Sequence, residues 1–141
     1  MVRAVLDANV YVSAALHPAG PPGRILERFI RDRVFELIAS PAIADETLRA
    51  LAYPKVRQHL RPDLDARAWF GHVLVLADLV LGQPMREAVC EDQDDDKYLA
   101  AALEGGAQYV VTGDRPFLSL REYQGVRVIT PRTFLEILDA S

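Results

Sequence analysis

Short apolar runs alternate along the chain with longer segments whose apolar residues recur at helical spacing. The runs at 2–6, 35–39, 108–112 and 126–129 predict strands, and either 79–81 or 88–90 could supply a fifth. Helical patterns cover about 10–16, 22–32, 41–52, 55–60, 63–78, 94–104 and the residues after 131. Strands that alternate with helices predict an α/β fold, with a mainly parallel sheet covered on both faces.

Capping residues mark where several of these helices begin and end. Ser40 and Thr130 each precede a proline, an arrangement typical of a helix start. Asn9 is the expected cap of the helix over 10–16. The pair Gly105-Gly106 is expected to end the helix over 94–104.

The composition is that of an ordinary globular protein. A length of 141 residues predicts a single domain, 1–141. The lone cysteine, Cys90, excludes an internal disulfide and fits a reducing compartment. We see no signal-peptide layout and no apolar run of about 18 residues, so we expect a cytoplasmic protein with no membrane span.

The net charge of −4 would by itself argue against a nucleic-acid partner. Five of the acids, however, lie within residues 91–96, and the rest of the chain is close to neutral. If several of these acids bind metal, the overall charge says little about the partner.

Three aspartates stand where a parallel sheet would gather them. Asp7 follows the first strand, Asp114 follows the strand over 108–112, and Asp96 begins a helix. Ligands of parallel α/β sheets bind at the carboxyl ends of the strands, so these acids should converge on one pocket. Carboxylates so close together repel one another, and a hard divalent cation such as Mg²⁺ or Mn²⁺ would offset them. Asn9 and Thr112 are polar neighbours suited to supporting such a pocket.

Each of these acids also has a plainer interpretation. Asp96 shares a helical face with Leu99, Ala100 and Leu103, which favours a ligand role over the alternative of a helix cap. Asp94 and Asp95 point elsewhere by the same periodicity, and both are interpreted as solvated, as is Asp92. Asp7 alone could belong to a polar turn.

Glu46 illustrates the limit of periodicity. The apolar stripe of its helix is formed by Ala44, Thr47, Leu48 and Leu51. Glu46 lies on the opposite side, near Arg49, and the pattern predicts a surface residue. Nothing in the spacing requires it to face a pocket.

Three motifs nevertheless resemble those of PIN domains. Val5–Ser13 resembles the opening motif, Asp94–Ala102 the central acid and helix, and Val110–Leu118 the closing strand and acid. The segment from Ser40 to Lys55 resembles the helix that carries the family's second acid. The similarity spans nearly the whole chain and is strongest to the toxin branch of toxin–antitoxin pairs.

The resemblance implies a Mg²⁺- or Mn²⁺-dependent ribonuclease that cleaves single-stranded RNA. The family's catalytic, metal-binding acids correspond to Asp7, Glu46, Asp96 and Asp114. Asp45 is an alternative to Glu46, and Asn9 and Thr112 correspond to supporting polar groups. The implied fold is a three-layer α/β/α PIN-like fold with a five-stranded, mainly parallel sheet, and it is often dimeric. The implied partners are RNA, a cognate antitoxin and a second copy of the chain.

Two other functions stay open at this point. A Mg²⁺-dependent phosphatase could form an aspartyl-phosphate on Asp7, although Asn9 stands where that chemistry normally has a second acid. A non-catalytic binding module could keep the acids as a scaffold. The sequence leaves open which RNA is cleaved, where it is cleaved and whether one or two ions bind.

Overall fold

The computed structural model describes all 141 residues and confirms the α/β class. The strands are β1 (Arg3–Leu6), β2 (Glu36–Ala39), β3 (Asp78–Leu79), β4 (Tyr109–Val111), β5 (Glu122–Tyr123) and β6 (Val126–Ile129). The helices are α1 (Ala8–Leu16), α2 (Pro21–Asp32), α3 (Pro41–Ala52), α4 (Pro54–Arg57), α5 (Ala66–Leu76), α6 (Asp96–Gly105), α7 (Arg115–Leu118) and α8 (Pro131–Asp139). A 3-10 turn, η1 (Gln93–Asp95), leads directly into α6.

The sheet has six strands in the order β3-β2-β1-β4-β6-β5, so the expected number of five was wrong. Five strands are parallel, and β5 alone pairs antiparallel with β6. The turn between β5 and β6 places Gln124 and Gly125 at positive φ, as tight hairpins require. Two residues are too few to show alternation, and Gln-Gly is not the usual hairpin signal, so this edge strand could not be predicted from the pattern of residues.

The structure also decides between the two candidates for the remaining strand. Asp78 and Leu79 pair with β2, and the amide of Val80 extends the ladder by donating to the Ala39 carbonyl at 2.9 Å. Residues 88–90 form no strand and belong to the long connection that precedes α6.

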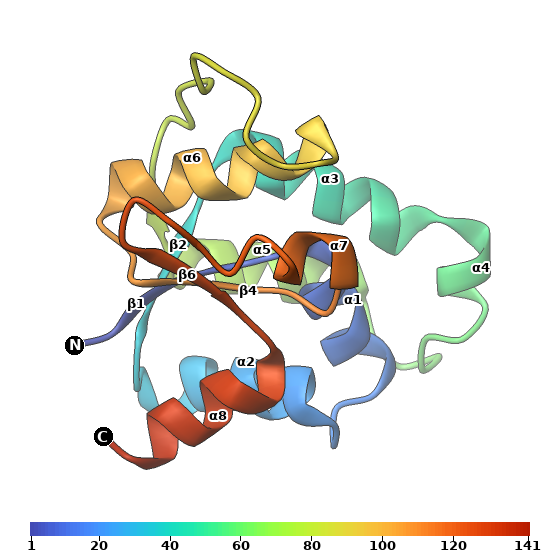
Figure 1. Cartoon of the computed structure of the whole chain (residues 1–141). Helices are drawn as coiled ribbons and strands as arrows, with labels where there is room; N and C mark the ends of the chain where they lie inside the picture. Colours follow the sequence, from blue (N-terminus) through green and yellow to red (C-terminus); the bar gives the residue numbers. More distant parts are fainter.

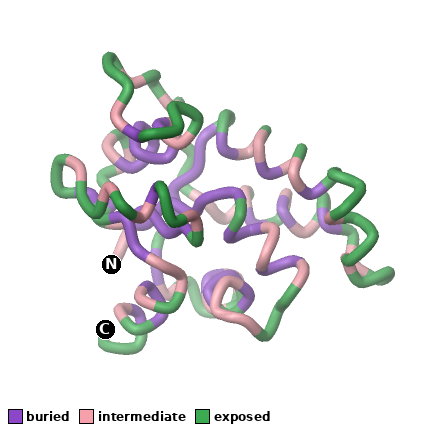
Figure 2. The backbone as a smooth tube through the Cα atoms, turned by 45° about the vertical axis from the view of Figure 1, so that its right-hand side comes forward, coloured by how far each residue is buried: buried purple, intermediate pink, exposed green.

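Helices cover both faces of the sheet in three layers (Figure 1). α6 and α3 lie on one side, and α2 and α8 lie on the other. Phe35 packs between Phe29 of α2 and Phe134 of α8, with ring centroids 5.2 Å and 5.0 Å away. Figure 2 shows that burial concentrates on the strands and on the inner sides of the helices. No helix has the combination of length and apolar character that crossing a bilayer requires.

Three of the expected helix caps are confirmed, and one is corrected. The hydroxyls of Ser40 and Thr130 accept from the amides three residues later, and Gly106 ends α6 in the left-handed region at a φ of 65°. The first helix instead begins at Ala8, and its cap is Asp7, whose carboxylate accepts from the Asn9 amide. Asn9 therefore lies inside the helix and its side chain is free for other contacts.

The topology explains why one end of the sheet is suited to a site. From β1 the chain moves outward to β2 and β3, and it then returns to the other side of β1 as β4. The order of strands therefore reverses between β1 and β4, the point at which ligands bind in open α/β sheets. Leu6 and Val111 are partners in the register, so Asp7 and Thr112 follow side by side.

Candidate functional site

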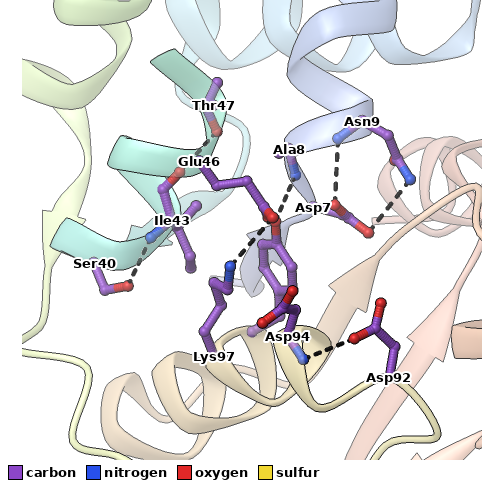
Figure 3. A network of polar contacts seen from close by, with 11 residues as sticks. Asp7, Ala8, Asn9, Ser40, Ile43, Glu46, Thr47, Asp92, Asp94 and Lys97 are labelled. Carbon is purple, nitrogen blue, oxygen red and sulfur yellow. Dashed lines mark hydrogen bonds and ion pairs between the residues drawn. The ribbon is translucent and has the colours of Figure 1, made fainter. Parts of the chain in front are cut away.

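A cavity of about 470 Å³ opens at this reversal point and is strongly acidic. Its charged lining consists of Asp7, Glu46, Asp92, Asp95 and Asp114. These residues come from the end of β1, from α3, from the approach to α6 and from the start of α7. No basic side chain lines the cavity. Figure 3 shows Asp7 and Glu46 facing the same space, with Asp92 and Asp94 near the start of α6.

Asp7 is the most enclosed of these acids, with 6% of its surface exposed. Its Oδ2 accepts from the Thr112 hydroxyl at 2.7 Å, and its Oδ1 accepts from the Asn9 amide at 3.3 Å. Burial raises the pKa of Asp7, and these hydrogen bonds counter the rise only in part. Because burial disfavours the charged form of Asp7, a cation bound beside it would stabilise that charged form.

Thr112 and Asn9 join the ends of β1 and β4. Thr112 donates to Asp7 and accepts from the backbone N–H of Asp114 at 3.0 Å, so one buried hydroxyl spaces the two acids. Asn9 donates to Asp7 Oδ2 at 3.4 Å and accepts from the Gly113 amide, also at 3.4 Å. Both residues therefore lie where supporting groups were expected. Asp114 in turn caps α7 by accepting from the Phe117 amide at 3.3 Å.

Glu46 lies at the cavity, whereas its neighbour Asp45 is exposed and outside it. The Tyr98 hydroxyl donates to Glu46 Oε1, and Lys97 Nζ lies 3.2 Å from Oε2. Tyr98 also accepts from the Ala8 amide at 3.2 Å, which connects α6 to the start of α1. The helical periodicity missed Glu46 because the polar side of α3 faces this cavity instead of bulk solvent.

Asp96 does not line the cavity. Its two carboxylate oxygens accept from the backbone N–H groups of Val89 at 3.0 Å and Cys90 at 2.7 Å. Burial alone would raise the pKa of Asp96, but hydrogen bonds from the Cys90 thiol and from both amides hold it below its usual value. Asp96 therefore lies on the buried apolar face of α6, as its periodicity predicted, but this face meets the preceding loop and not the expected pocket.

Asp95 takes the place at the cavity that the sequence had suggested for Asp96. Desolvation, followed by the charges of Asp7, Asp92, Asp114 and Glu46, raises the pKa of Asp95 to about 7. Periodicity placed Asp95 in solvent because it assumed 100° per residue throughout. Residues Gln93–Asp95 instead form the 3-10 turn η1, whose tighter winding changes the direction of the side chains.

The donor set fits a hard divalent cation. Every charged ligand candidate is a carboxylate oxygen. Desolvation and then repulsion raise the pKa of Asp95, and a bound cation would offset both. No three acidic, histidine or cysteine side chains are gathered tightly enough to hold an ion as they stand. Binding would therefore require the side chains around this open cavity to draw closer together.

Fold and site together define an α/β protein whose acidic cavity lies at the switch point of a mainly parallel sheet. Residues 3–116 match the sequence model described as "PIN domain", and the chain belongs to the PIN-domain family. PIN domains are generally nucleases. The resemblance of the motifs to PIN domains is thereby confirmed.

One protein of similar sequence and one solved structure also match this chain. The chain is 30% identical over 146 residues to the uncharacterized protein MJ1680 of Methanocaldococcus jannaschii, covering 96% of this chain and 90% of that protein. The crystal structure of PAE2754 from Pyrobaculum aerophilum superposes with a TM-score of 0.59 at 21% identity, covering 99% of this chain and 97% of that one. This structural likeness supports the fold alone.

Proposed function

We propose that this chain is a ribonuclease that uses Mg²⁺ or Mn²⁺ to hydrolyse phosphodiester bonds of single-stranded RNA. The observation that carries the proposal is the convergence of five carboxylates on one open cavity at the switch point of the sheet. A phosphate would be repelled by these acids if no cation were present. The family assignment supports nuclease chemistry, and the all-oxygen donor set supports the choice of cation.

The residues divide into those that would hold the cation and those that fix the holders. Asp7, Asp95 and Asp114 are the principal ligands in this proposal. Glu46 is a weaker candidate because Lys97 already offsets part of its charge. When bound, one or two divalent ions would supply the positive charge that in-line hydrolysis of a phosphodiester needs. Thr112 spaces the two strand-end acids through its hydrogen bonds to Asp7 and to the Asp114 amide.

The phosphatase alternative fits the geometry less well. Both oxygens of Asp7 accept hydrogen bonds, which lowers their nucleophilicity. The position two residues later holds Asn9, whose amide donates to Asp7 and offers no acid. A hydrolytic role with Asp7 as a cation ligand agrees better with these contacts.

Cleavage of a fluorescent single-stranded RNA tests the proposal. Wild-type protein should cleave with Mn²⁺ and stop when EDTA is added. Asp7→Asn, Asp95→Asn and Asp114→Asn should fold and lose the metal-dependent activity, because each removes a charge from the cavity. Asp94→Asn removes the same charge from an exposed neighbour outside the cavity and should stay active. Wild-type rates in all three cavity variants would refute the assignment of the site.

The biological role proposed for this nuclease is that of a toxin in a toxin–antitoxin pair. We infer that the protein acts in the cytoplasm as a homodimer and is inhibited by a cognate antitoxin protein. Its motifs resemble the toxin branch of the family, and the family assignment agrees with a nuclease toxin. Induced expression should arrest growth, and Asp7→Asn should abolish the arrest. Size-exclusion chromatography with light scattering should give twice the chain mass of 15.7 kDa, and a monomer would refute the dimer.

A further inference from the structure

The segment 80–92, which connects β3 to η1, is attached to helix α6 at both of its ends. Near its start, Glu104 accepts from the amides of Leu81 at 3.1 Å, Gly82 at 2.8 Å and Gln83 at 3.2 Å. Near its end, Asp96 accepts from the amides of Val89 and Cys90. In Figure 1 this segment arches over α6, and the residues between the two attachments are mostly exposed.

The attachment at Asp96 satisfies amides that have no other acceptor. Neither Val89 nor Cys90 donates to a backbone carbonyl, and Cys90 is buried. A buried amide without an acceptor costs free energy comparable to a lost hydrogen bond, so the main chain at 89–90 is held by this carboxylate. An aspartate supplies two acceptor oxygens, whereas an asparagine would turn an NH₂ donor toward one of the two amides.

Two acids of the cavity follow directly after this attachment. Asp92 lies two residues beyond Cys90, and its Oδ1 accepts from the Asp94 amide at 3.0 Å. The Asp92 carbonyl accepts from the Asp95 amide, also at 3.0 Å, which closes the turn η1. Asp92 and Asp95 both line the cavity. The turn η1, which carries Asp95 and follows Asp92, is therefore held at both ends. Asp96 holds the main chain before the turn, and the turn continues directly into α6.

We propose that Asp96 is a positioning residue, which holds the main chain at Val89 and Cys90 and thereby keeps Asp92 and Asp95 directed into the cavity. This inference rests on the proposed function, because the cavity matters only if it takes a divalent cation. It assigns to Asp95 the ligand role and to Asp96 the placement of the turn. Glu104 performs the corresponding attachment at the far end of the segment, away from the cavity.

Mn²⁺ titration calorimetry and amide hydrogen exchange on the full chain test this division of roles. Asp95→Asn should weaken Mn²⁺ binding while the amides of 89–90 exchange as slowly as in wild type. Asp96→Asn should speed exchange over 89–95 and weaken Mn²⁺ binding by about tenfold, the cost typical of losing a group that orients ligands. Asp96→Glu keeps two acceptor oxygens and should recover part of both losses.

Glu104→Gln is the matched control, because it releases the same segment at its other end. It should speed exchange at 81–83 and leave Mn²⁺ affinity unchanged. Equal loss of affinity in Glu104→Gln and Asp96→Asn would overturn the proposal, since general loosening of the segment would then suffice. Loss of affinity in Asp96→Asn with unchanged exchange at 89–90 would also overturn it, because Asp96 would then act as a ligand.

Failure of the proposed function can be distinguished from failure of this inference. A wild-type chain that binds no Mn²⁺ would refute the proposed function. Hydrogen exchange at the amides of Asp94 and Asp95 alone would then test whether Asp96 holds the turn η1 in place. Asp96→Asn should raise those rates, and unchanged rates would refute the positioning role.

Discussion

Replacing Asp95 by asparagine should stabilise the protein at neutral and alkaline pH when no metal is present. Asp95 carries a charge into a cavity that already contains Asp7, Asp92, Asp114 and Glu46. Desolvation and these like charges raise its pKa from the ordinary 3.8 to about 7. The asparagine side chain removes the repulsion and keeps nearly the same shape.

The magnitude follows from the linkage between pKa and stability. A pKa that rises from 3.8 to about 7 on folding is equivalent to about 4 kcal/mol, at about 1.4 kcal/mol per pH unit. Because Asp95 is only partly buried, solvent screens much of this, and we expect Asp95→Asn to gain about 1–2 kcal/mol at pH 8. The folded chain binds the proton more tightly than the unfolded chain. The charged Asp95 therefore lowers the stability of the folded chain by its full amount above about pH 7, and this loss of stability disappears as the pH falls towards 4.

Urea unfolding in EDTA at pH 8 and at pH 4.5 measures this gain. Asp94→Asn is the control, since Asp94 is exposed, lies outside the cavity and changes the net charge equally. Asp95→Asn should exceed Asp94→Asn in unfolding free energy at pH 8, and most of the difference should vanish at pH 4.5. Equal stability of the two variants at pH 8, or a difference independent of pH, would refute the electrostatic argument.

Three further substitutions test the core and the contacts of the site. Tyr11→Phe removes a buried hydroxyl that has no hydrogen-bond partner, so urea unfolding should show a gain of about 1 kcal/mol; a loss would mean that the hydroxyl has an acceptor. Gly23→Ala should lower stability by about 1–3 kcal/mol, because the new Cβ would lie 2.2 Å from the Pro18 carbonyl oxygen; an unchanged urea midpoint would contradict this crowding. Tyr98→Phe deletes the hydroxyl that donates to Glu46 and should weaken Mn²⁺ binding in calorimetry by about tenfold; wild-type affinity would show that this contact does not orient the site.

The fold could be predicted from local signals because those signals agreed with one another. The Ser-Pro and Thr-Pro starts of α3 and α8 and the Gly106 end of α6 set element bounds that the structure confirms. Alternating strands and helices gave the parallel sheet, and with it the meeting of Asp7 and Asp114 at neighbouring strand ends. These features depend on short stretches of sequence, so one sequence suffices to find them.

The site was harder to predict, because it depends on how elements pack. Glu46 faces inward only since the polar side of α3 borders the cavity, which no helical periodicity reveals. Asp96 lies on the buried face of α6, as periodicity predicted, but that face meets the main chain at Val89 and Cys90 and not the cavity. Asp95 reaches the cavity from the 3-10 turn η1, and such a turn at a helix start leaves no clear pattern in the sequence. The resemblance to PIN domains identified the correct region, and the hydrogen bonds then separated the acid at the cavity from its neighbour.

A crystal soaked with Mn²⁺ would show whether the acidic cavity binds the divalent cation that the proposed RNA hydrolysis requires. The anomalous difference map should show Mn²⁺ at coordination distance from carboxylate oxygens of Asp7, Asp95 and Asp114. Asp96 should still accept from the amides of Val89 and Cys90. A soaked crystal with no Mn²⁺ in the cavity would contradict the proposed cation site, and an ion bound to Asp96 in place of Asp95 would contradict the roles proposed for these two residues.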